Sequence, residues 1–241
     1  MPSAVRKILT AQLAKVWAEC RLMVFGRPLF SGIVEHCSWV QSVKARGEDV
    51  VEIKVARPQD FQDLARGDSI AVNGICLTVE AFTIDDISFA IGPETLRVVG
   101  WTPESLQDLP VNLERAMLAQ SRIHGHWVTG HVDGLGKVLA VRQLGETREL
   151  RIGFGQQFAL WIWPKGSIAV QGVSLTINAV DEGWFSVCII PETLRRTNLG
   201  LLQEGMSVNL EADTLAKGVA HVLSHLVQGR QGNELGRSPL S

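Results

Sequence analysis

Residues 69–79 read SIAVNGICLTV, and residues 167–177 read SIAVQGVSLTI. Seven of the eleven positions are identical, and one of the differences exchanges the thiol of Cys76 for the hydroxyl of Ser174. The first stretch has apolar runs on both sides of Asn73-Gly74, a dipeptide that favours the two-residue turn of a β-hairpin. In the second stretch glutamine replaces the asparagine, which weakens this signal, but the glycine is kept. We therefore predict the same hairpin twice.

The similarity continues along the chain at an offset of 98 residues, with one slip of a single residue. PETLR at 93–97 returns at 191–195, SGIV at 31–34 aligns with TGHV at 129–132, and VNLE at 111–114 returns at 208–211. The period is too long for a solenoid, whose units span roughly 20 to 50 residues, and fits a duplicated small domain. We place the first copy at 29–127 and the second at 128–211. A helix at 212–228 follows, and the polar composition of 229–241 predicts a disordered tail.

Each copy has the pattern of an all-β domain. Short apolar or alternating runs at 87–92 and 184–190 are typical of strands, and Gly and Pro interrupt such runs at short intervals. Several short strands with turn signals favour a small closed barrel or a sandwich. Short helices are expected at 58–65 and at the matching 155–162, whereas the repeated Leu-Thr and Pro-Glu-Thr stretches are expected to be strands.

The C-terminal helix, expected near 212–227, has an apolar stripe. Its members recur at helical spacing and are Leu215, Val219, Val222, Leu223 and Leu226. The stripe has no obvious use within either duplicated domain. Because an exposed apolar stripe usually marks a contact surface, it predicts a partner for this helix.

The composition excludes several classes of protein. A net charge of -2 over 241 residues gives no clustered basic face for nucleic acid, and no apolar run is long enough to cross a membrane. A reducing, cytoplasmic location is expected. The four cysteines form no C-x-x-C pair and have the spacing of neither a zinc site nor a disulfide framework. They are Cys20, Cys37, Cys76 and Cys188.

Eight stretches, in this order on the duplicated frame, resemble the riboflavin synthases of the α-chain type. They are LFSGIVE, GDSIAVNGICLTV, PETLR, VNLERA, GHWVTGHVDG, KGSIAVQGVSLTI, IPETLRRTNLG and VNLEADTLAKGV. The resemblance covers about residues 29–226. It implies an all-β fold of two duplicated six-stranded Greek-key β-barrels plus a C-terminal helix, and a homotrimer that associates through these helices.

The family's reaction is a dismutation. Two molecules of 6,7-dimethyl-8-ribityllumazine exchange a four-carbon unit and give riboflavin and 5-amino-6-ribitylamino-pyrimidinedione. The resemblance implies one substrate in each barrel, two per site, where the first barrel of one chain faces the second barrel of another. It implies no cofactor and no metal ion, and lumazine synthase is a further partner to expect. The exchange of Cys76 for Ser174 then falls where the two rings meet, so that near-identical pockets can assign unequal roles.

The resemblance also implies which residues bind substrate. They are a threonine from each Leu-Thr stretch, a threonine from each Pro-Glu-Thr stretch and four further pocket positions: Thr78, Thr176, Thr95, Thr193, Gly92, Ile190, Lys165 and Gln171. Threonine is common in strands because it is β-branched, so a structural role is the alternative for each threonine alone. Their paired recurrence favours binding.

Six residues match the reacting part of the family's site: His131, Cys76, Ser174, Phe30, Ser31 and Asp213. Imidazole is the natural general base near neutral pH, and a base must remove a proton from the acidic 7-methyl group of one substrate. Structural alternatives remain, because a lone cysteine is most often a small buried hydrophobe and Asp213 fits a surface carboxylate. His126 is expected to hold its strand in place, and no third ligand near the histidines completes a metal site.

The chain departs from the family pattern at three places. Gln171 replaces the aspartate of the second hairpin, which removes a carboxylate expected at the rim of the second pocket. The first PETLR continues as VVGWT instead of RTNLG, and HGH replaces GGH at 124–126.

The competing class is a lumazine-binding antenna protein, which is expected to let its second pocket decay. Here the second copy retains the family's motifs more completely than the first, with KGS, VSLT and IPETLRRTNLG, which favours the enzyme. A flavin reductase is a third alternative, but no G-x-G-x-x-G follows a strand.

Residues 1–28 differ from the rest of the chain. They carry five basic residues against the single acid Glu19, and they precede Leu29, where the family begins with methionine. We hypothesise that Leu29 is the true initiator, because the TTG codon encodes leucine and also serves as a start codon in bacteria. Residues 1–28 would then not be part of the fold. An amphipathic helix outside the barrel and a targeting segment are the alternatives.

Overall fold

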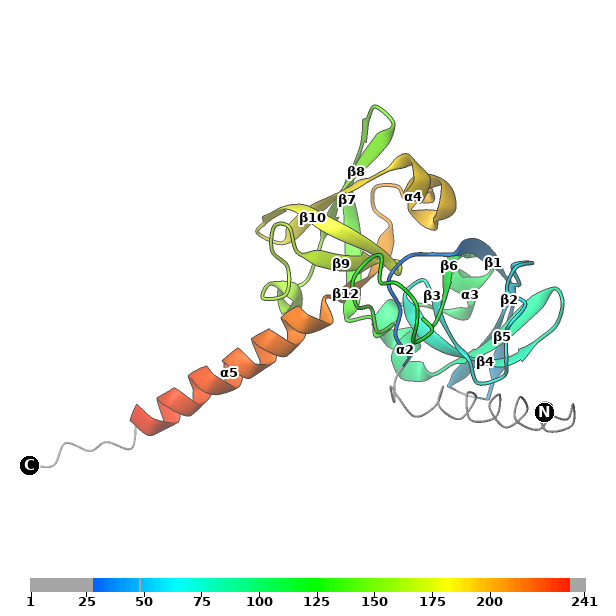
Figure 1. The fold of residues 1–241 in the computed structure, drawn as a ribbon, viewed down its shortest axis with the longest axis horizontal. Coiled ribbons are helices and arrows are strands. Elements are labelled where there is room, and N and C mark those ends of the chain that lie inside the picture. Colours follow the sequence, from blue (N-terminus) through cyan, green and yellow to red (C-terminus); the bar gives the residue numbers. More distant parts are fainter. Residues whose placement is uncertain (1–27, 48, 235–241) are drawn as a thin grey trace, which may run out of the picture.

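The computed structural model describes residues 28–47 and 49–234, with side chains through residue 225. The hypotheses about the N-terminal extension therefore fall almost wholly outside the described residues, as do residues 235–241 of the predicted tail. The prediction of a disordered tail is wrong for residues 229–234, because they continue the C-terminal helix. Two β-barrels lie next to each other, and one long helix projects from the second barrel (Figure 1). Within the described residues, no helix is both long and apolar enough to cross a membrane.

Each half of the chain forms a closed antiparallel barrel of six strands, which confirms the predicted fold class. The first barrel has the strand order β1-β2-β5-β4-β3-β6. Its strands are β1 (His36–Arg46), β2 (Val50–Ala56), β3 (Ser69–Val72), β4 (Ile75–Phe82), β5 (Asp86–Ile91) and β6 (Pro110–Arg115).

The second barrel repeats this order as β7-β8-β11-β10-β9-β12. Its strands are β7 (Gly134–Leu144), β8 (Thr147–Gly153), β9 (Ser167–Val170), β10 (Val173–Asp181), β11 (Trp184–Ile189) and β12 (Ser207–Ala212). The sequence duplication is thus a duplication of the whole barrel.

The two hairpins at the centre of the repeat form as predicted. In each one the residues that flank the turn pair directly, so only two residues make the turn. Asn73 and Gly74 have φ of 48° and 80°, and Gln171 and Gly172 have φ of 51° and 79°. Positive φ at both turn positions is the type I′ geometry, whose twist matches that of the flanking strands.

Each barrel encloses its own apolar core. Inward and outward side chains alternate along the strands, as in β2, where Val51, Ile53 and Val55 are buried. Phe89 in the first barrel and Phe185 in the second are completely buried. Burial of a side chain of this size contributes about 1.5–3 kcal/mol, so the two cores supply most of the stabilisation of the fold.

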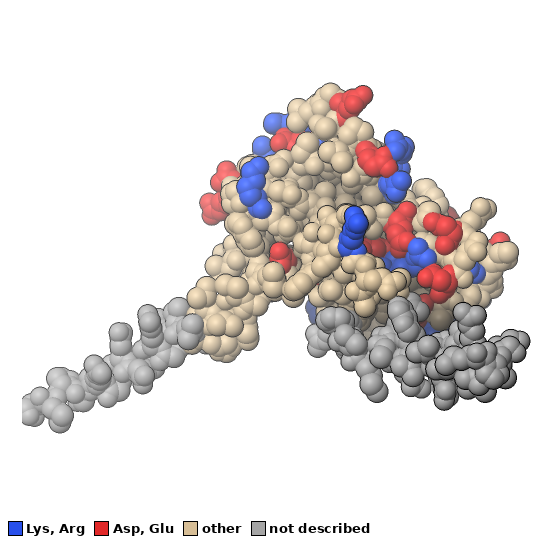
Figure 2. Space-filling model, viewed as in Figure 1, with Lys and Arg blue, Asp and Glu red and all other residues tan. Residues whose placement is uncertain are grey.

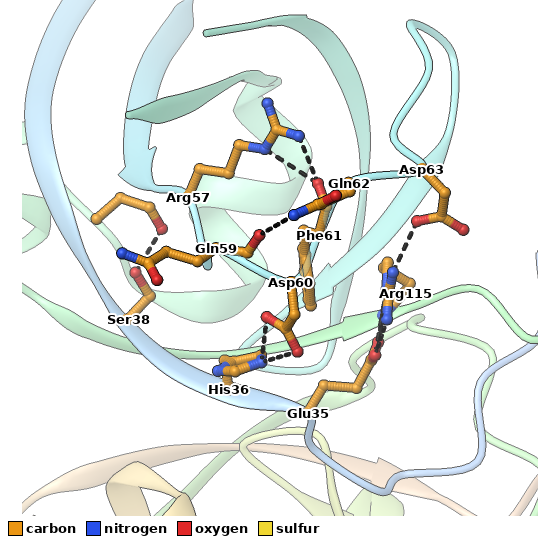
Figure 3. A network of polar contacts seen from close by, with 11 residues as sticks. Glu35, His36, Ser38, Arg57, Gln59, Asp60, Phe61, Gln62, Asp63 and Arg115 are labelled. Atoms are coloured by element: carbon orange, nitrogen blue, oxygen red, sulfur yellow. Dashed lines mark hydrogen bonds and ion pairs between the residues drawn. The ribbon is translucent and has the colours of Figure 1, made fainter. Parts of the chain in front are cut away.

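The helix predicted at 58–65 is wrong, because these residues form turns. Polar contacts fix the segment against the barrel instead (Figure 3). The Arg57 guanidinium donates to the carbonyl of Phe61 at 2.6 and 3.0 Å, so it occupies a backbone acceptor that a helix would use. Asp60 lies 2.8 Å from the His36 ring nitrogen and anchors the turn to β1.

Arg115 completes the same network from β6 (Figure 3). Its guanidinium lies over the ring of Phe61, 4.3 Å from the ring centroid, and donates to Asp63 at 2.7 Å and to Glu35. The matching segment of the second barrel is helical only over the single 3-10 turn η1 (Gln156–Phe158).

The prediction that the Pro-Glu-Thr stretches are strands is also wrong. They form the short helices α2 (Pro93–Val99) and α4 (Pro191–Arg196). Proline begins each helix, where its missing N–H removes no intrahelical hydrogen bond. Further helical segments are α3 (Pro103–Leu106), η2 (Asn198–Leu201) and α5 (Thr214–Glu234), the last of which confirms the predicted C-terminal helix and extends beyond the predicted range.

The glycines of the two hairpin turns meet where the barrels contact each other. A Cβ atom added to Gly74 would lie 2.8 Å from the backbone nitrogen of Gly172, and one added to Gly172 would lie 2.7 Å from that of Gly74. Both distances are too short for a carbon atom. The approach of the two backbones therefore requires glycine on both sides.

Buried amide side chains surround these turns. The Asn112 Nδ2 donates to the Asn198 Oδ1 at 2.8 Å and to the Gln171 carbonyl at 2.9 Å, and the Asn209 Nδ2 donates to the Asn73 carbonyl at 2.9 Å. Each barrel thus supplies hydrogen-bond partners for buried polar groups of the other. Without a partner, each of these groups would lower the free energy of unfolding by about 1–3 kcal/mol. Asn198 belongs to the RTNLG stretch, which the first copy lacks. The second copy therefore supplies an asparagine that forms hydrogen bonds with Asn112 and Asn73 of the first barrel, and the first copy has no equivalent residue.

The contact between the barrels predicts unequal effects for two glycine substitutions. Gly74→Ala should lower the free energy of unfolding by about 3 kcal/mol or more, because it adds a clash to left-handed backbone strain. Gly183→Ala is the control, since Gly183 has φ 77° but its Cβ would meet nothing within 4 Å among the described residues. It should cost only about 1–2 kcal/mol. Equal losses in urea unfolding of the two variants would contradict the tight contact.

Candidate functional site

A cleft of about 540 Å³ opens on the first barrel beside Thr78. Thr78 is exposed on β4, where it pairs with Ser69. The cleft is lined by Arg46, Glu52, Arg66, Gly67, Thr78, Val79, Glu80, Ala81 and Ser88. It has room for a small heterocyclic ligand with hydrogen-bonding groups.

Thr95 and Gly92 belong to the same end of the first barrel. The pairing of Val79 with Phe89 brings the end of β5 alongside the start of β4. Gly92 follows β5 directly, and Thr95 lies in the first turn of α2. Gly92 precedes the helix with an extended backbone (φ -79°, ψ 165°). The predicted binding residues of this barrel therefore come from neighbouring elements.

The second barrel repeats this arrangement. Thr176 is exposed on β10 and pairs with Ser167, and the pairing of Ile177 with Val187 brings the end of β11 to the same edge. Ile190 precedes α4 with φ -78° and ψ 158°, nearly the geometry of its counterpart in the first barrel. Ile190 is 56% exposed, and Thr193 is half-buried on α4.

Lys165 is exposed and has a left-handed backbone, with φ 70°. The first barrel has Gly67 at this position, with φ 89°. Both residues make the same backbone hydrogen bond, 2.8 Å long, from Lys165 to Ile177 and from Gly67 to Val79. Because left-handed backbone strains a residue with a side chain, a lysine here points to a function for its side chain.

Two segments join the barrels, and we name 30–32 and 128–130 the crossing segments. Phe30 and Val128 pair across an antiparallel bridge, with N–O distances of 2.8 and 3.1 Å. Phe30 is fully buried there, against Ala71 and Ala169 and beside Cys76. Phe30 therefore belongs to a small core between the barrels.

A buried carboxylate holds each crossing segment. Glu114, 4% exposed, accepts hydrogen bonds from the Ser31 nitrogen (2.7 Å), the Ser31 hydroxyl (3.0 Å) and the Gly32 nitrogen (3.0 Å). Burial raises the pKa of Glu114 to about 7, and the three hydrogen bonds act in the opposite direction.

Glu211, 2% exposed, accepts the equivalent hydrogen bonds from the Thr129 nitrogen (2.7 Å), the Thr129 hydroxyl (2.7 Å) and the Gly130 nitrogen (3.0 Å). Burial likewise raises the pKa of Glu211, against the hydrogen bonds from Thr129.

Each crossing segment also contacts the hairpin of the other barrel. The Ser174 nitrogen donates to the Gly32 carbonyl at 2.7 Å, and the Cys76 nitrogen donates to the Gly130 carbonyl at 2.8 Å. A Cβ atom on Gly32 would lie 2.6 Å from the Cβ of Ser174, and one on Gly130 would lie 2.5 Å from that of Cys76. The exchanged thiol and hydroxyl thus occupy equivalent places.

Ser174 lies in a group of polar residues. Its hydroxyl is 2.7 Å from the Nδ1 atom of the half-buried His126, whose backbone nitrogen donates to the Ser31 carbonyl at 3.2 Å. Burial lowers the pKa of His126, and the nearby charge of Asp213 acts in the opposite direction. His126 is therefore neutral near pH 7 and in contact with a hydroxyl. The sequence predicted only that His126 holds its strand in place, and did not anticipate this contact with Ser174.

Cys76 has a different environment. Burial raises the pKa of its thiol, while a hydrogen bond with Ser69 acts to lower it. The thiol is therefore protonated at neutral pH and is no activated thiolate. His131 follows Gly130, whose carbonyl accepts from the Cys76 nitrogen, and the His131 side chain is exposed.

Two further predicted residues have structural contacts. The Asp213 carboxylate accepts from the Leu215 nitrogen at 2.8 Å and so caps α5. The Gln171 side-chain oxygen accepts from the Asn209 nitrogen at 3.2 Å, within the contact between the barrels. Among the described residues, no group of three His, Cys, Asp or Glu side chains is placed to hold a metal ion.

The sequence interpretation missed Glu114 and Glu211 as residues of the site. Their signal was present, because the repeated VNLE ends on these two acids. A glutamate that returns with its apolar neighbours in a strand pattern is a candidate for a buried acid with a fixed partner.

Comparisons with known proteins agree with this geometry. The lumazine-binding domain family matches the chain twice, over residues 31–116 and 129–213. The riboflavin synthase of Actinobacillus pleuropneumoniae is 37% identical over 195 residues, covering 81% of this chain and 90% of that protein. The riboflavin synthase of Schizosaccharomyces pombe is 38% identical over 190 residues, covering 78% and 91%.

Solved structures show the same fold. LumP in complex with 6,7-dimethyl-8-(1'-D-ribityl) lumazine has a TM-score of 0.68 and 23% identity, covering 76% of this chain and 98% of that chain. LumP in complex with riboflavin has a TM-score of 0.69 and 24% identity, with the same coverage.

Proposed function

The chain belongs to the lumazine-binding family of the riboflavin synthases, and we propose that it catalyses their dismutation of 6,7-dimethyl-8-ribityllumazine. One molecule transfers a four-carbon unit to a second, which gives riboflavin and 5-amino-6-ribitylamino-pyrimidinedione. The observation that carries the proposal is that both barrels place threonines at equivalent positions, on β4 and α2 in the first barrel and on β10 and α4 in the second. A reaction between two molecules of one compound needs two binding sites of this kind.

Each pocket is proposed to bind one substrate molecule. The first uses Thr78, Gly92 and Thr95. The second uses Lys165, Thr176, Ile190 and Thr193. Gln171 stays a proposed residue of the second site, and its side-chain oxygen also accepts a hydrogen bond from the backbone nitrogen of Asn209. The two products together contain the atoms of the two substrates, so the reaction needs no oxidant or reductant, and no cofactor or metal ion is part of the proposal.

The two barrels contribute different chemistry to the substrates. A base must remove a proton from the 7-methyl group of one ring, and a nucleophile adds at C7 of the other. Ser174 in contact with the neutral His126 supplies a hydroxyl next to a base, whereas Cys76 supplies a neutral thiol. His131, next to Gly130, is the second candidate base, and Ser31, Phe30 and Asp213 complete the proposed site.

We also propose that three chains associate through α5. The helix projects away from both barrels (Figure 1), and in Figure 2 its described surface shows almost no charged side chains, in contrast to the mixed charges on the barrels. Leu215, Val219, Val222 and Leu223 are each 55–60% exposed on it. A partner helix would bury them. The cytoplasmic location and the association with lumazine synthase stay predictions.

The alternative function is that of a lumazine-binding antenna protein, which binds the ligand without catalysing a reaction. Such a protein is expected to bind ligand in the first barrel and to let the second pocket decay. Here the second barrel keeps its threonines and, at Lys165, keeps a lysine in strained backbone. The likeness to LumP concerns the fold, whereas the identity of 37–38% to riboflavin synthases covers most of the chain. These observations support the enzyme.

Riboflavin formation tests the proposed function directly. The purified protein, incubated with 6,7-dimethyl-8-ribityllumazine and no added cofactor, should consume two substrate molecules for each riboflavin formed and release an equal amount of the pyrimidinedione. Chromatography with absorbance detection measures all three compounds. Stoichiometric binding of the lumazine without any riboflavin would move the chain to the antenna class.

The strained backbone of Lys165 allows its binding role to be separated from stability. Lys165→Gly and Lys165→Asn both remove the charge, and both new residues tolerate left-handed φ. We expect equal or higher stability to urea but about tenfold weaker binding of one lumazine per chain, a loss of about 1.4 kcal/mol. Calorimetric titration measures both sites. Unchanged affinity at both sites would remove Lys165 from the pocket.

If α5 joins the chains, a substitution within its apolar stripe should affect assembly and activity, and one outside the stripe should not. Leu223→Asp should give monomers with little activity, because a charge in the apolar stripe opposes burial and each site needs two chains. Ser224→Asp is the matched control, since Ser224 is on the opposite side of the helix from the stripe, and it should stay trimeric and active. Sedimentation and activity are measured at the same protein concentration. Fully active Leu223→Asp monomers would refute the shared site.

A further inference from the structure

Two buried carboxylates take no part in the proposed chemistry, yet each is connected to a reactive residue through one glycine. Glu114 and Glu211 are matching residues of β6 and β12. Each accepts three hydrogen bonds from the crossing segment that begins its own barrel. The glycine of that segment then accepts a hydrogen bond from the hairpin of the other barrel.

We infer that Glu114 and Glu211 are positioning residues for the reaction, and that each acts on the opposite barrel. Glu114 fixes Ser174 through Gly32, and Glu211 fixes Cys76 through Gly130. The inference rests on the proposed function for its effect on turnover. Its structural part, that a carboxylate of one barrel sets the position of the reactive residue in the other, is independent of that function.

The hydrogen bonds require a carboxylate at these positions. In each case one oxygen accepts two bonds from a serine or threonine, and the other oxygen accepts the glycine N–H. An amide of the same size replaces one of these oxygens by an NH₂ group, which is a donor only. The NH₂ group would face an N–H, so the crossing segment would lose a partner and shift.

A shift of the crossing segment passes on to the hairpin. The space between Gly130 and Cys76 does not admit a Cβ atom, and the same is true between Gly32 and Ser174. Closely packed interiors transmit small displacements, because no empty volume absorbs them. Since catalysis depends on reacting groups held within a fraction of an ångström, a small shift of Ser174 or Cys76 should lower the rate.

The chain offers a matched control next to Glu114. Glu35 is a carboxylate of the same barrel, and it accepts from the Arg115 nitrogen at 2.7 Å and pairs with the Arg115 side chain. Its counterpart Asp133 accepts from the Ala212 nitrogen at 2.8 Å and pairs with Lys217. These contacts stay within one barrel and its flanking helix. Glu35→Gln therefore removes a carboxylate without releasing a crossing segment.

The kinetic test compares Glu114→Gln, Glu211→Gln and the control Glu35→Gln. The first two should lower kcat by about tenfold or more and leave KM within about threefold, because the binding threonines lie outside the crossing segments. The control should keep kcat within about twofold. A kcat within twofold of the parent protein in Glu114→Gln and Glu211→Gln would overturn the inference.

The structural test uses the reactivity of Cys76. Its alkylation rate with iodoacetamide, resolved from the other cysteines by peptide mass spectrometry, should change at least about fivefold in Glu211→Gln. In Glu114→Gln it should stay within about twofold, although Glu114 belongs to the same barrel as Cys76. The opposite pattern, or an equal change in both variants, would overturn the action across barrels. A protein that forms no riboflavin can still give the expected pattern, so failure of the proposed function is distinguishable.

A milder variant is available if Glu211→Gln does not fold. Thr129→Val removes only the hydroxyl that donates to Glu211 and preserves the shape of the side chain. It should change the alkylation rate of Cys76 in the same direction by about twofold or more and lower kcat by at least a similar factor. No change in either quantity would count against Glu211 as a positioning residue.

Discussion

Three hydrogen bonds to one buried carboxylate, formed twice, hold the centre of this molecule. Glu114 and Glu211 fix the crossing segments, and the carbonyls of Gly32 and Gly130 then fix the hairpins that carry Ser174 and Cys76. The hairpin turns also touch each other, which only glycine allows. Two barrels that could have been independent domains are therefore parts of one structure, and Ser174 and Cys76, the residues proposed to react, lie where the barrels depend on each other.

Near-symmetry with a few exceptions suits a reaction between two molecules of one compound. The threonines proposed to bind substrate recur at equivalent places in the two barrels. The exceptions lie at the centre, where a protonated thiol in one copy replaces a hydroxyl in the other, and where His126 has only Pro28 as its counterpart. Lys165 in place of Gly67 adds a charge to the second barrel. Such differences are what the proposed dismutation requires, because its two substrate molecules take the unequal parts of donor and acceptor.

The sequence predicted the features that local patterns determine. The duplication, the two-residue hairpins and the all-β character follow from repeated residues, turn chemistry and alternation. Those patterns left a barrel or a sandwich open, and only the family resemblance predicted closed six-stranded barrels. The sequence interpretation failed at 58–65, where Arg57 takes the carbonyl that a helix would need, and at the Pro-Glu-Thr stretches, where proline begins a helix. The contacts of Glu114 and Glu211 span more than 80 positions, and no local pattern reports a partner at that separation.

The most direct test of this account measures the stability of each barrel separately in one protein. Hydrogen exchange of peptides from β4 and from β10, followed along a urea gradient, gives one unfolding midpoint for each barrel. The account predicts that the two midpoints coincide, because each hairpin depends on the crossing segment of the other barrel. Two well-separated midpoints, with one barrel unfolded while the other stays protected, would contradict it.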